Sequence, residues 1–143
     1  MEREHAEALH AKWLLKLPQP VETSSGPTTE YLDGIGMLLD DPVFWRAYFE
    51  RRLPRGAVPI AQGASGATIL GILGRGALMR SPLKMYGIEM HGRGPEGPGP
   101  LDVAIVDDCS FTGATIAQLR LRAQGLGWNV VAIVTAWPWV PLG

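Results

Sequence analysis

Residues 101–115, LDVAIVDDCSFTGAT, contain the pattern that decides the fold. Leu101–Val106 is a continuous apolar run, which is typical of a strand buried on both faces of a parallel sheet. Two adjacent acids, Asp107 and Asp108, follow it, and a loop of small and hydroxyl residues then leads into a helix expected at 114–124. We therefore predict that this strand end and this helix start lie together at one edge of a sheet, where ligands bind in open α/β folds.

The rest of the chain alternates between strand-like and helix-like segments. We expect further strands at 28–32, 57–61, 83–90 and 130–134, helices at 2–17, 42–52 and 67–80, and loops at 63–66, 91–100 and 107–113. Strands separated by helices predict an open, mainly parallel sheet flanked by helices. We interpret residues 1–143 as a single domain with an N-terminal region at 1–40, an α/β core at 41–137 and a tail at 138–143.

The helix expected at 42–52 has a marked start and an aromatic face. Asp41 can accept hydrogen bonds from free N–H groups of the first turn, and Pro42 is tolerated at the first helical position. The aromatic face consists of Phe44, Trp45, Tyr48 and Phe49. We interpret it as a packing face.

The composition favours a globular protein and excludes several classes. The chain has 143 residues, of which 46% are hydrophobic, and its 13 Lys and Arg nearly balance 14 Asp and Glu. We therefore expect no nucleic-acid partner, which would require a basic surface. Cys109 is the single cysteine, so no internal disulfide can form. Residues 1–5 are charged and no apolar run is long enough to span a bilayer, so we expect a cytoplasmic protein without a membrane partner.

Two glycine patterns do not indicate nucleotide sites. Residues 92–97 formally match the dinucleotide fingerprint G-x-G-x-x-G, but Pro98 and Pro100 follow, and no helix can start there to receive pyrophosphate. Residues 63–66 do not form a P-loop because no Gly-Lys-Ser/Thr follows them. The acidic strand end therefore remains the main candidate site.

The expected helix start at this strand end is suited to a sugar phosphate. Its free N–H groups and the positive end of the helix dipole favour a phosphate, and Gly113 allows close backbone approach. The carboxylates of Asp107 and Asp108 can accept hydrogen bonds from a ribose diol or approach a metal ion. Alternatively, the two aspartates only cap the turn that follows them.

The motif VDDCSFTGAT resembles the phosphoribosyl pyrophosphate (PRPP) motif of type I phosphoribosyltransferases. The resemblance implies that Asp107 and Asp108 contact the ribose hydroxyls as catalytic residues and hold Mg²⁺ directly or indirectly. It also implies a 5′-phosphate loop made of Cys109, Ser110, Phe111, Thr112, Gly113, Ala114 and Thr115. Residues 59–66 are similar to the family's pyrophosphate loop, which here would be Gln62, Gly63, Ala64, Ser65 and Gly66, although an ordinary strand–helix turn is nearly as good an interpretation.

The order of elements is similar to the orotate branch of that family. The similarity includes Ser25-Gly26, Tyr31-Leu32-Asp33 and residues 38–42, and it implies a reduced N-terminal hood over the site. His91, Gly92 and Arg93 resemble that branch's flexible catalytic loop, which would close as a lid. The branch has basic residues just before this loop, but residues 85–90 contain no Lys or Arg, so Arg80, Lys84 or Arg93 would have to replace them.

We therefore expect an enzyme that binds Mg²⁺·PRPP and transfers ribose 5-phosphate to a nucleobase, either orotate or another pyrimidine or purine, releasing pyrophosphate. The resemblance also implies a homodimer, with the aromatic face of helix 42–52 and the tail tryptophans as candidate contacts. The alternative is a non-catalytic regulatory protein of the same fold that binds PRPP or a nucleotide. A nucleotide-binding α/β domain outside the family is the third interpretation. Cys109 lies where a helix start can lower a thiol pKa, but we interpret it as a passive loop residue because no base partner is evident.

Overall fold

The computed structural model of the chain describes residues 1–23, 26–79, 100–109 and 113–142. Eleven helices and strands lie within these ranges. In chain order they are α1 (Glu2–Trp13), β1 (Leu14–Thr23), β2 (Gly26–Leu32), α2 (Gly34–Asp40), α3 (Pro42–Arg52), β3 (Val58–Gln62), α4 (Gly63–Leu73), β4 (Ala77–Met79), β5 (Asp102–Cys109), α5 (Ala114–Gly125) and β6 (Asn129–Trp137). The strand expected at 83–90 and nearly all of the loop expected at 91–100 lie outside the described residues.

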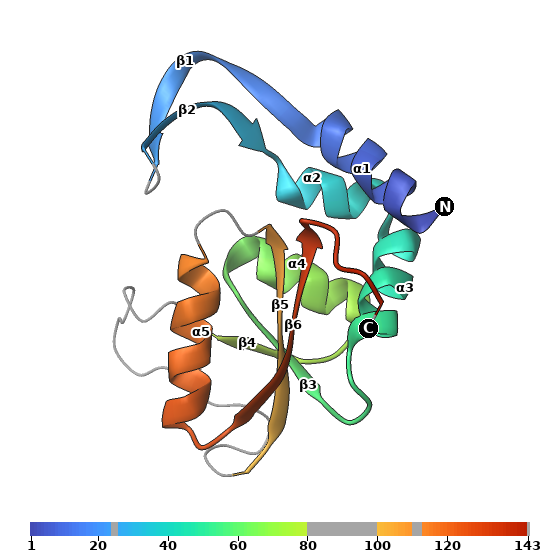
Figure 1. Cartoon of the computed structure of the whole chain (residues 1–143), viewed down its shortest axis with the longest axis vertical. Helices are drawn as coiled ribbons and strands as arrows, with labels where there is room; N and C mark the ends of the chain where they lie inside the picture. Colours follow the sequence, from blue (N-terminus) through green and yellow to red (C-terminus); the bar gives the residue numbers. More distant parts are fainter. Residues whose placement is uncertain (24–25, 80–99, 110–112, 143) are drawn as a thin grey trace.

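A parallel sheet forms the body of the molecule. Its strand order is β4-β3-β5-β6, and every neighbouring pair is parallel. Figure 1 shows α5 on one face of the sheet, with α3 and α4 on the other. The predicted open, parallel α/β sheet flanked by helices is therefore confirmed.

The central strand β5 is buried on both faces, because its residues Val103–Val106 are all apolar and all buried. Val103 and Ile105 point to the α5 side, where they pack with Leu119. Ala104 and Val106 point to the other side and join the core formed with the N-terminal helices. This double burial explains why the sequence of the strand shows no alternation.

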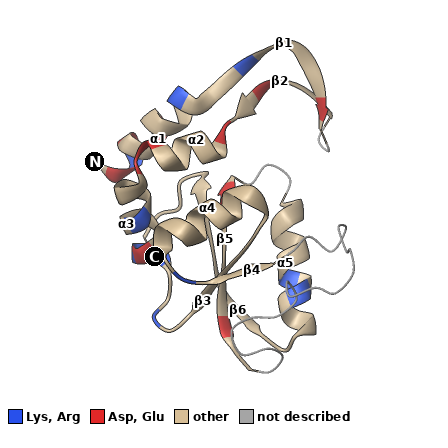
Figure 2. Cartoon of the chain, turned by 180° about the vertical axis from the view of Figure 1, so that it is seen from behind, with Lys and Arg blue, Asp and Glu red and all other residues tan. Residues whose placement is uncertain are grey.

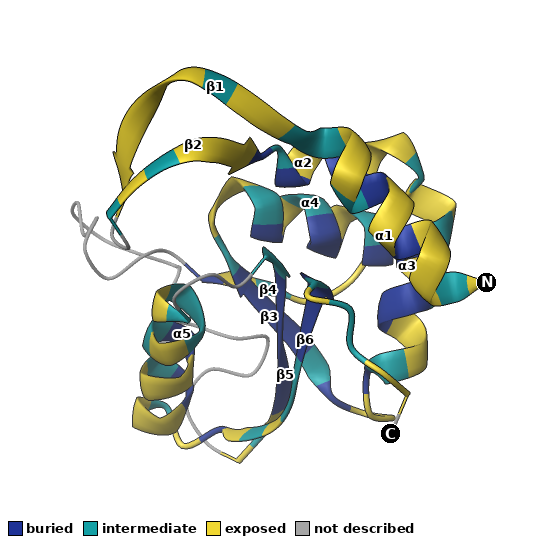
Figure 3. Cartoon of the chain, turned by 45° about the horizontal axis from the view of Figure 1, so that its top comes forward, coloured by how far each residue is buried: buried dark blue, intermediate teal, exposed yellow. Residues whose placement is uncertain are grey.

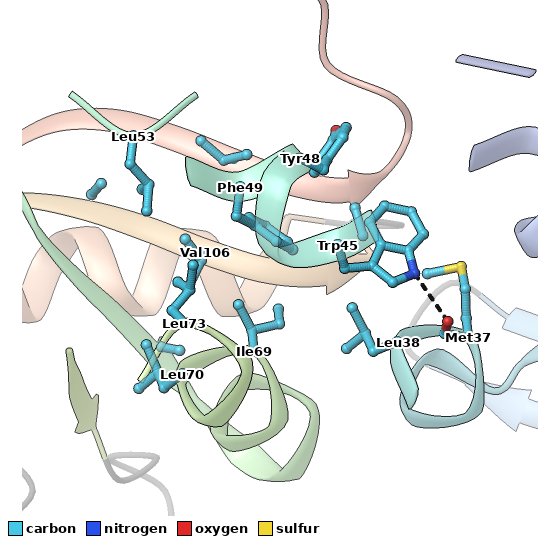
Figure 4. Packing of buried hydrophobic residues seen from close by; sticks show 14 of the residues in the cluster. Met37, Leu38, Trp45, Tyr48, Phe49, Leu53, Ile69, Leu70, Leu73 and Val106 are labelled. Atoms are coloured by element: carbon cyan, nitrogen blue, oxygen red, sulfur yellow. Dashed lines mark hydrogen bonds between the residues drawn. The ribbon is translucent and has the colours of Figure 1, made fainter. Parts of the chain in front are cut away.

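Helix α3 has the predicted bounds and the predicted cap. The Asp41 carboxylate accepts a hydrogen bond from the Phe44 N–H at 3.1 Å. Trp45, Tyr48 and Phe49 are fully buried within the chain, and the Trp45 indole N–H donates to the Met37 carbonyl at 3.0 Å (Figure 4). The interpretation as a packing face is confirmed, whereas these three rings are unavailable as the dimer contacts that we also considered.

The N-terminal helix is shorter than predicted. It ends at Trp13, and Leu14–Thr23 instead pairs antiparallel with β2, so that Leu14 lies opposite Leu32 and Lys16 opposite Glu30. Pro18 is tolerated because β1 belongs to a separate two-stranded sheet and has an edge free of pairing. Figure 1 shows this hairpin over the end of the sheet at which β5 and β6 finish, and most of its residues are exposed (Figure 3).

Helix α2 was not predicted. Asp33 caps it by accepting from the Gly36 N–H at 2.9 Å, a signal present in the sequence. The glycines at 34 and 36 lower helix propensity, and tertiary packing of Met37 and Leu38 outweighs that cost.

The structure also corrects the boundaries of α4 and β5. Residues 63–66, expected as a loop, form the first turn of α4, because Gly63 at φ +79° lets β3 turn directly into the helix. The helix ends at Leu73 rather than at residue 80, since Gly74 adopts a left-handed cap whose N–H bonds the Leu70 carbonyl. Strand β5 continues through Cys109 because β6 pairs with it as far as Trp137.

Charge is spread over the described surface. Lys and Arg segments alternate with Asp and Glu segments in Figure 2 and do not gather into one basic face. No helix among the described residues is long and apolar enough to cross a membrane.

Candidate functional site

The two adjacent acids lie on the last residues of β5, not on a loop. Asp107 pairs with Thr135 of β6 in the parallel register, and its side chain is buried. Asp108 is half-buried. Strand pairing therefore fixes the backbone that carries both carboxylates.

Asp107 is a buried acid that lacks a cationic partner among the described residues. Its Oδ1 accepts a hydrogen bond from the Asp108 N–H at 2.9 Å. Burial, followed by the adjacent Asp108 side chain, raises the pKa of Asp107 to about 8. The site thus contains a carboxyl group that would gain from hydroxyl donors or a cation.

The Asp108 carboxylate lies against α2. A Cβ placed on Gly34 would lie 1.7 Å from Asp108 Oδ2, so only glycine leaves room for this carboxylate. The N-terminal region therefore helps to position one of the two acids.

Cys109 follows the acids on the same strand. Burial, followed by Asp108 and Asp107, raises the pKa of its thiol to about 12. Burial thus opposes any activation of the thiol by the helix start, and Cys109 lies on β5 rather than on the predicted loop.

A cavity of about 680 Å³ lies between the strand ends and the β1–β2 hairpin. Asp107, Cys109 and residues 113–116 form its floor. His10, Trp137 and hairpin residues between Thr23 and Leu32 form the remaining walls. Volumes of this size accommodate small-molecule ligands.

The structure brings part of the predicted phosphate loop into this cavity. Gly113, Ala114 and Thr115 line it, and Gly113 adopts φ +75° as the N-cap of α5. The other loop members, Ser110, Phe111 and Thr112, lie outside the described residues. A phosphate at the start of α5 would lie within reach of the acidic strand end.

The predicted pyrophosphate loop lies at the same edge of the sheet but does not line the cavity. Gln62 ends β3, and its Nε2 donates to Gln118 Oε1 of α5 at 3.1 Å. Gly66 packs against Ala61, since a Cβ there would lie 2.9 Å from the alanine Cβ. The Gln62 Oε1 atom is buried without a partner among the described atoms.

The other predicted site residues are basic contacts to pyrophosphate and members of the flexible loop. Arg80, Lys84, His91, Gly92 and Arg93 all lie outside the described residues. Within the described part of the chain, neither Lys nor Arg lines the cavity.

The sequence did not single out the walls of the cavity. His10 and Trp137 stack with ring centroids 4.0 Å apart and an interplanar angle of 14°, although 127 positions separate them in the chain. Glu30 lies on β2 and also lines the cavity. The alternation of Thr28, Glu30 and Leu32 could have indicated one strand face, but the partner of that face depends on the tertiary fold.

The acids offer an incomplete set of ligands for Mg²⁺. Two adjacent carboxylates are hard oxygen donors of the kind Mg²⁺ prefers, but the described residues contain no group of three or more His, Cys, Asp and Glu that could hold a metal. The pair fits a Mg²⁺ ion that takes its other ligands from substrate oxygens and water.

No protein-family model and no curated protein matches the chain. Solved structures do. The chain resembles UMP synthase from Leishmania donovani, with a TM-score of 0.62, 21% identity and 94% of this chain covered, but it spans only 31% of that enzyme's length. Orotate phosphoribosyltransferase from Mycobacterium tuberculosis H37Rv, solved with inorganic phosphate, matches at a TM-score of 0.62 and 16% identity over 94% of this chain and 80% of its own.

Adenine phosphoribosyltransferase from Thermoanaerobacter pseudethanolicus matches at a TM-score of 0.57 and 21% identity, over 90% of this chain and 85% of its own. At these low identities, the TM-scores show that the chain and these proteins share a fold. The chain therefore has the type I phosphoribosyltransferase fold that its strand-end motif led us to expect.

Proposed function

We propose that the chain binds Mg²⁺·PRPP and transfers its ribose 5-phosphate to a nucleobase nitrogen, releasing pyrophosphate. One observation carries the proposal: the buried Asp107 and the start of α5 form the floor of one cavity of about 680 Å³. An acceptor for ribose hydroxyls thus lies next to a helix start suited to a phosphate.

In this proposal the residues of the chain mainly position the substrate. Asp107 and Asp108 accept hydrogen bonds from the ribose hydroxyls, while residues 110–115 hold the 5′-phosphate. The bond from ribose C1 to pyrophosphate breaks, the bond from C1 to the base nitrogen forms, and the nitrogen releases its proton to solvent. Mg²⁺ would supply positive charge to the departing pyrophosphate. The hairpin β1–β2 covers the reacting carbon and limits its access to water.

We also propose roles for two loops, a division of the chain into a hood and a core, and an oligomeric state. Residues 62–66 receive pyrophosphate, and residues 91–93 belong to a lid. Residues 1–40 form a hood over the core at 41–137. The family resemblance supports a homodimer that works in the cytoplasm.

A second candidate function is the binding of PRPP or a nucleotide for regulation, without turnover. It is favoured by the absence of Lys and Arg from the described cavity walls and from residues 85–90 of the sequence. Positive charge near departing pyrophosphate is usually a large part of catalysis.

Phosphorus NMR separates the two functions. The chain is mixed with PRPP, Mg²⁺ and a panel of purine and pyrimidine bases, including orotate. Base-dependent release of pyrophosphate, lost in Asp107→Asn, is the result expected of a transferase. Intact PRPP with broadened resonances supports the regulatory function, and unperturbed PRPP in every sample contradicts both.

A further inference from the structure

The aromatic wall of the cavity points to a flat ligand. His10 of α1 stacks on Trp137 at the end of β6, with centroids 4.0 Å apart, and both rings line the cavity. Each ring is half-buried, so the pair is held by the fold and still reachable from the cavity. A planar heterocycle can lie against such a wall with favourable contact between rings.

Among the residues that the structure describes, Glu30 lines the cavity beside this wall and neither Lys nor Arg does. Glu30 lies on the same face of β2 as the buried Leu32, with its own side chain exposed. Burial lowers the pKa of the His10 imidazole, and the charge of Glu30, which raises that pKa, has the smaller effect.

Lys16 is the cation nearest in the hairpin register, opposite Glu30 on the neighbouring strand. It is exposed and does not line the cavity. The carboxylate of Glu30 has no hydrogen-bond donor among the described residues and is available to a ligand.

We propose that the acceptor taken by this cavity is an uncharged planar heterocycle whose N–H groups donate to Glu30, and not a base that carries a carboxylate. The inference rests on the proposed function, because transfer requires the acceptor to lie between the ribose site and the hairpin. A carboxylated base would meet the negative charge of Glu30, and no described cation lines the cavity to balance its carboxylate. An uncharged base with N–H donors would satisfy Glu30 and stack on the His10–Trp137 wall.

The test is a calorimetric titration of bases into the full chain saturated with Mg²⁺ and ribose 5-phosphate, which does not require turnover. The panel pairs adenine, hypoxanthine and uracil with the carboxylated bases orotate and nicotinate. We expect the uncharged bases to bind at least about tenfold more tightly. Glu30→Gln should weaken their binding about tenfold, since it removes a charged acceptor. Glu22→Gln, an exposed glutamate of β1 that does not line the cavity, should leave it unchanged.

Equal or tighter binding of the carboxylated bases would overturn the inference. The absence of binding by every uncharged base would also overturn it, as would unaltered binding of these bases to Glu30→Gln. Saturation by ribose 5-phosphate is measured first in the same samples. If that sugar phosphate does not bind, the proposed function fails instead, and the two failures are distinguished.

Discussion

Asp107 contributes to how the stability of the free protein depends on pH. Its pKa rises from 3.8 to about 8, mainly through burial. Between these two values the folded chain binds more protons than the unfolded chain, so the free energy of unfolding falls as pH rises. The contribution of the protonated acid is complete below about pH 4 and is lost as pH rises through about 8.

Asp107→Asn should remove this dependence. The amide cannot ionise, so between pH 5 and 8 the variant should lose less stability than the wild type, by at least the ~1.4 kcal/mol that one pKa unit represents. Urea unfolding at both pH values gives the difference, with Glu22→Gln as the control for an exposed acid. Parallel losses in wild type and Asp107→Asn would show that the acid is not buried as described.

Cys109 should react slowly with alkylating agents. Its pKa of about 12 leaves little thiolate at pH 8, and the thiolate is the reactive form. Iodoacetamide labelling followed by mass spectrometry is simple to interpret because the chain has one cysteine. We expect a rate at least about tenfold below that of the urea-unfolded chain. A folded chain that reacts as fast as the unfolded one would refute the assignment.

At the scale of elements, α2 determines where the Asp108 carboxylate can lie. Gly34→Ala would place a Cβ 1.7 Å from Asp108 Oδ2, and the carboxylate would have to turn away. We expect at least about tenfold weaker binding of Mg²⁺·PRPP, from the loss of one charged acceptor at the ribose. Calorimetry measures the affinity, and circular dichroism verifies that the variant is folded.

Gly71→Ala in α4 is the matched control. A Cβ there meets nothing within 4 Å, so the variant should bind PRPP normally. It should also gain about 0.5–1 kcal/mol of stability from helix propensity. Unchanged PRPP affinity in Gly34→Ala would contradict the role given to α2.

Most elements could be predicted because their signals are local. The Asp41-Pro42 start of α3 and the apolar runs of β5 and β6 depend on their own residues and sheet burial. Helix α2 and the end of α1 could not be predicted, because they depend on packing and strand pairing with residues that are distant in the sequence. Gly34 and Gly36 argue against a helix until Met37 and Leu38 are known to be buried, and Leu14 reads as helical until Leu32 is known to face it.

At the scale of the molecule, a buried arginine joins three distant parts of the chain. The Arg52 guanidinium of α3 donates to the Glu2 carboxylate of α1 and to the Val140 carbonyl of the tail. It also lies 3.8 Å from the centroid of the Tyr48 ring. The Trp139 indole N–H donates to the same Glu2 carboxylate at 3.1 Å. This Arg52–Glu2 cluster holds α1, which carries one wall of the cavity.

Arg52→Met should destabilise the chain by about 2 kcal/mol, because it leaves partly buried acceptors without their donor. Arg51→Met is the control, since Arg51 reaches the same carboxylate from an exposed position and should cost under about 0.5 kcal/mol. Urea unfolding of both variants supplies the comparison. Equal losses of unfolding free energy in the two variants would show that the burial of Arg52 does not contribute to stability.

The floor of the candidate site could be predicted from the sequence and its walls could not. Asp107, Asp108 and the start of α5 are adjacent in the chain, so a local motif is enough to identify them. The His10–Trp137 wall and the hairpin reach the same cavity only through long-range packing. Cys109 shows the same limit, since its helix-start position predicts a lowered pKa but burial beside two acids raises it.

The central claim is that the acids at the end of β5 hold the ribose of PRPP. The most direct measurement is a calorimetric titration of Mg²⁺·PRPP into the wild-type chain and Asp107→Asn, with Glu22→Gln as the control. We predict saturable binding to the wild type and the control, and at least about tenfold weaker binding to Asp107→Asn. Absence of binding to the wild-type chain, or equal affinity in Asp107→Asn, would contradict the claim.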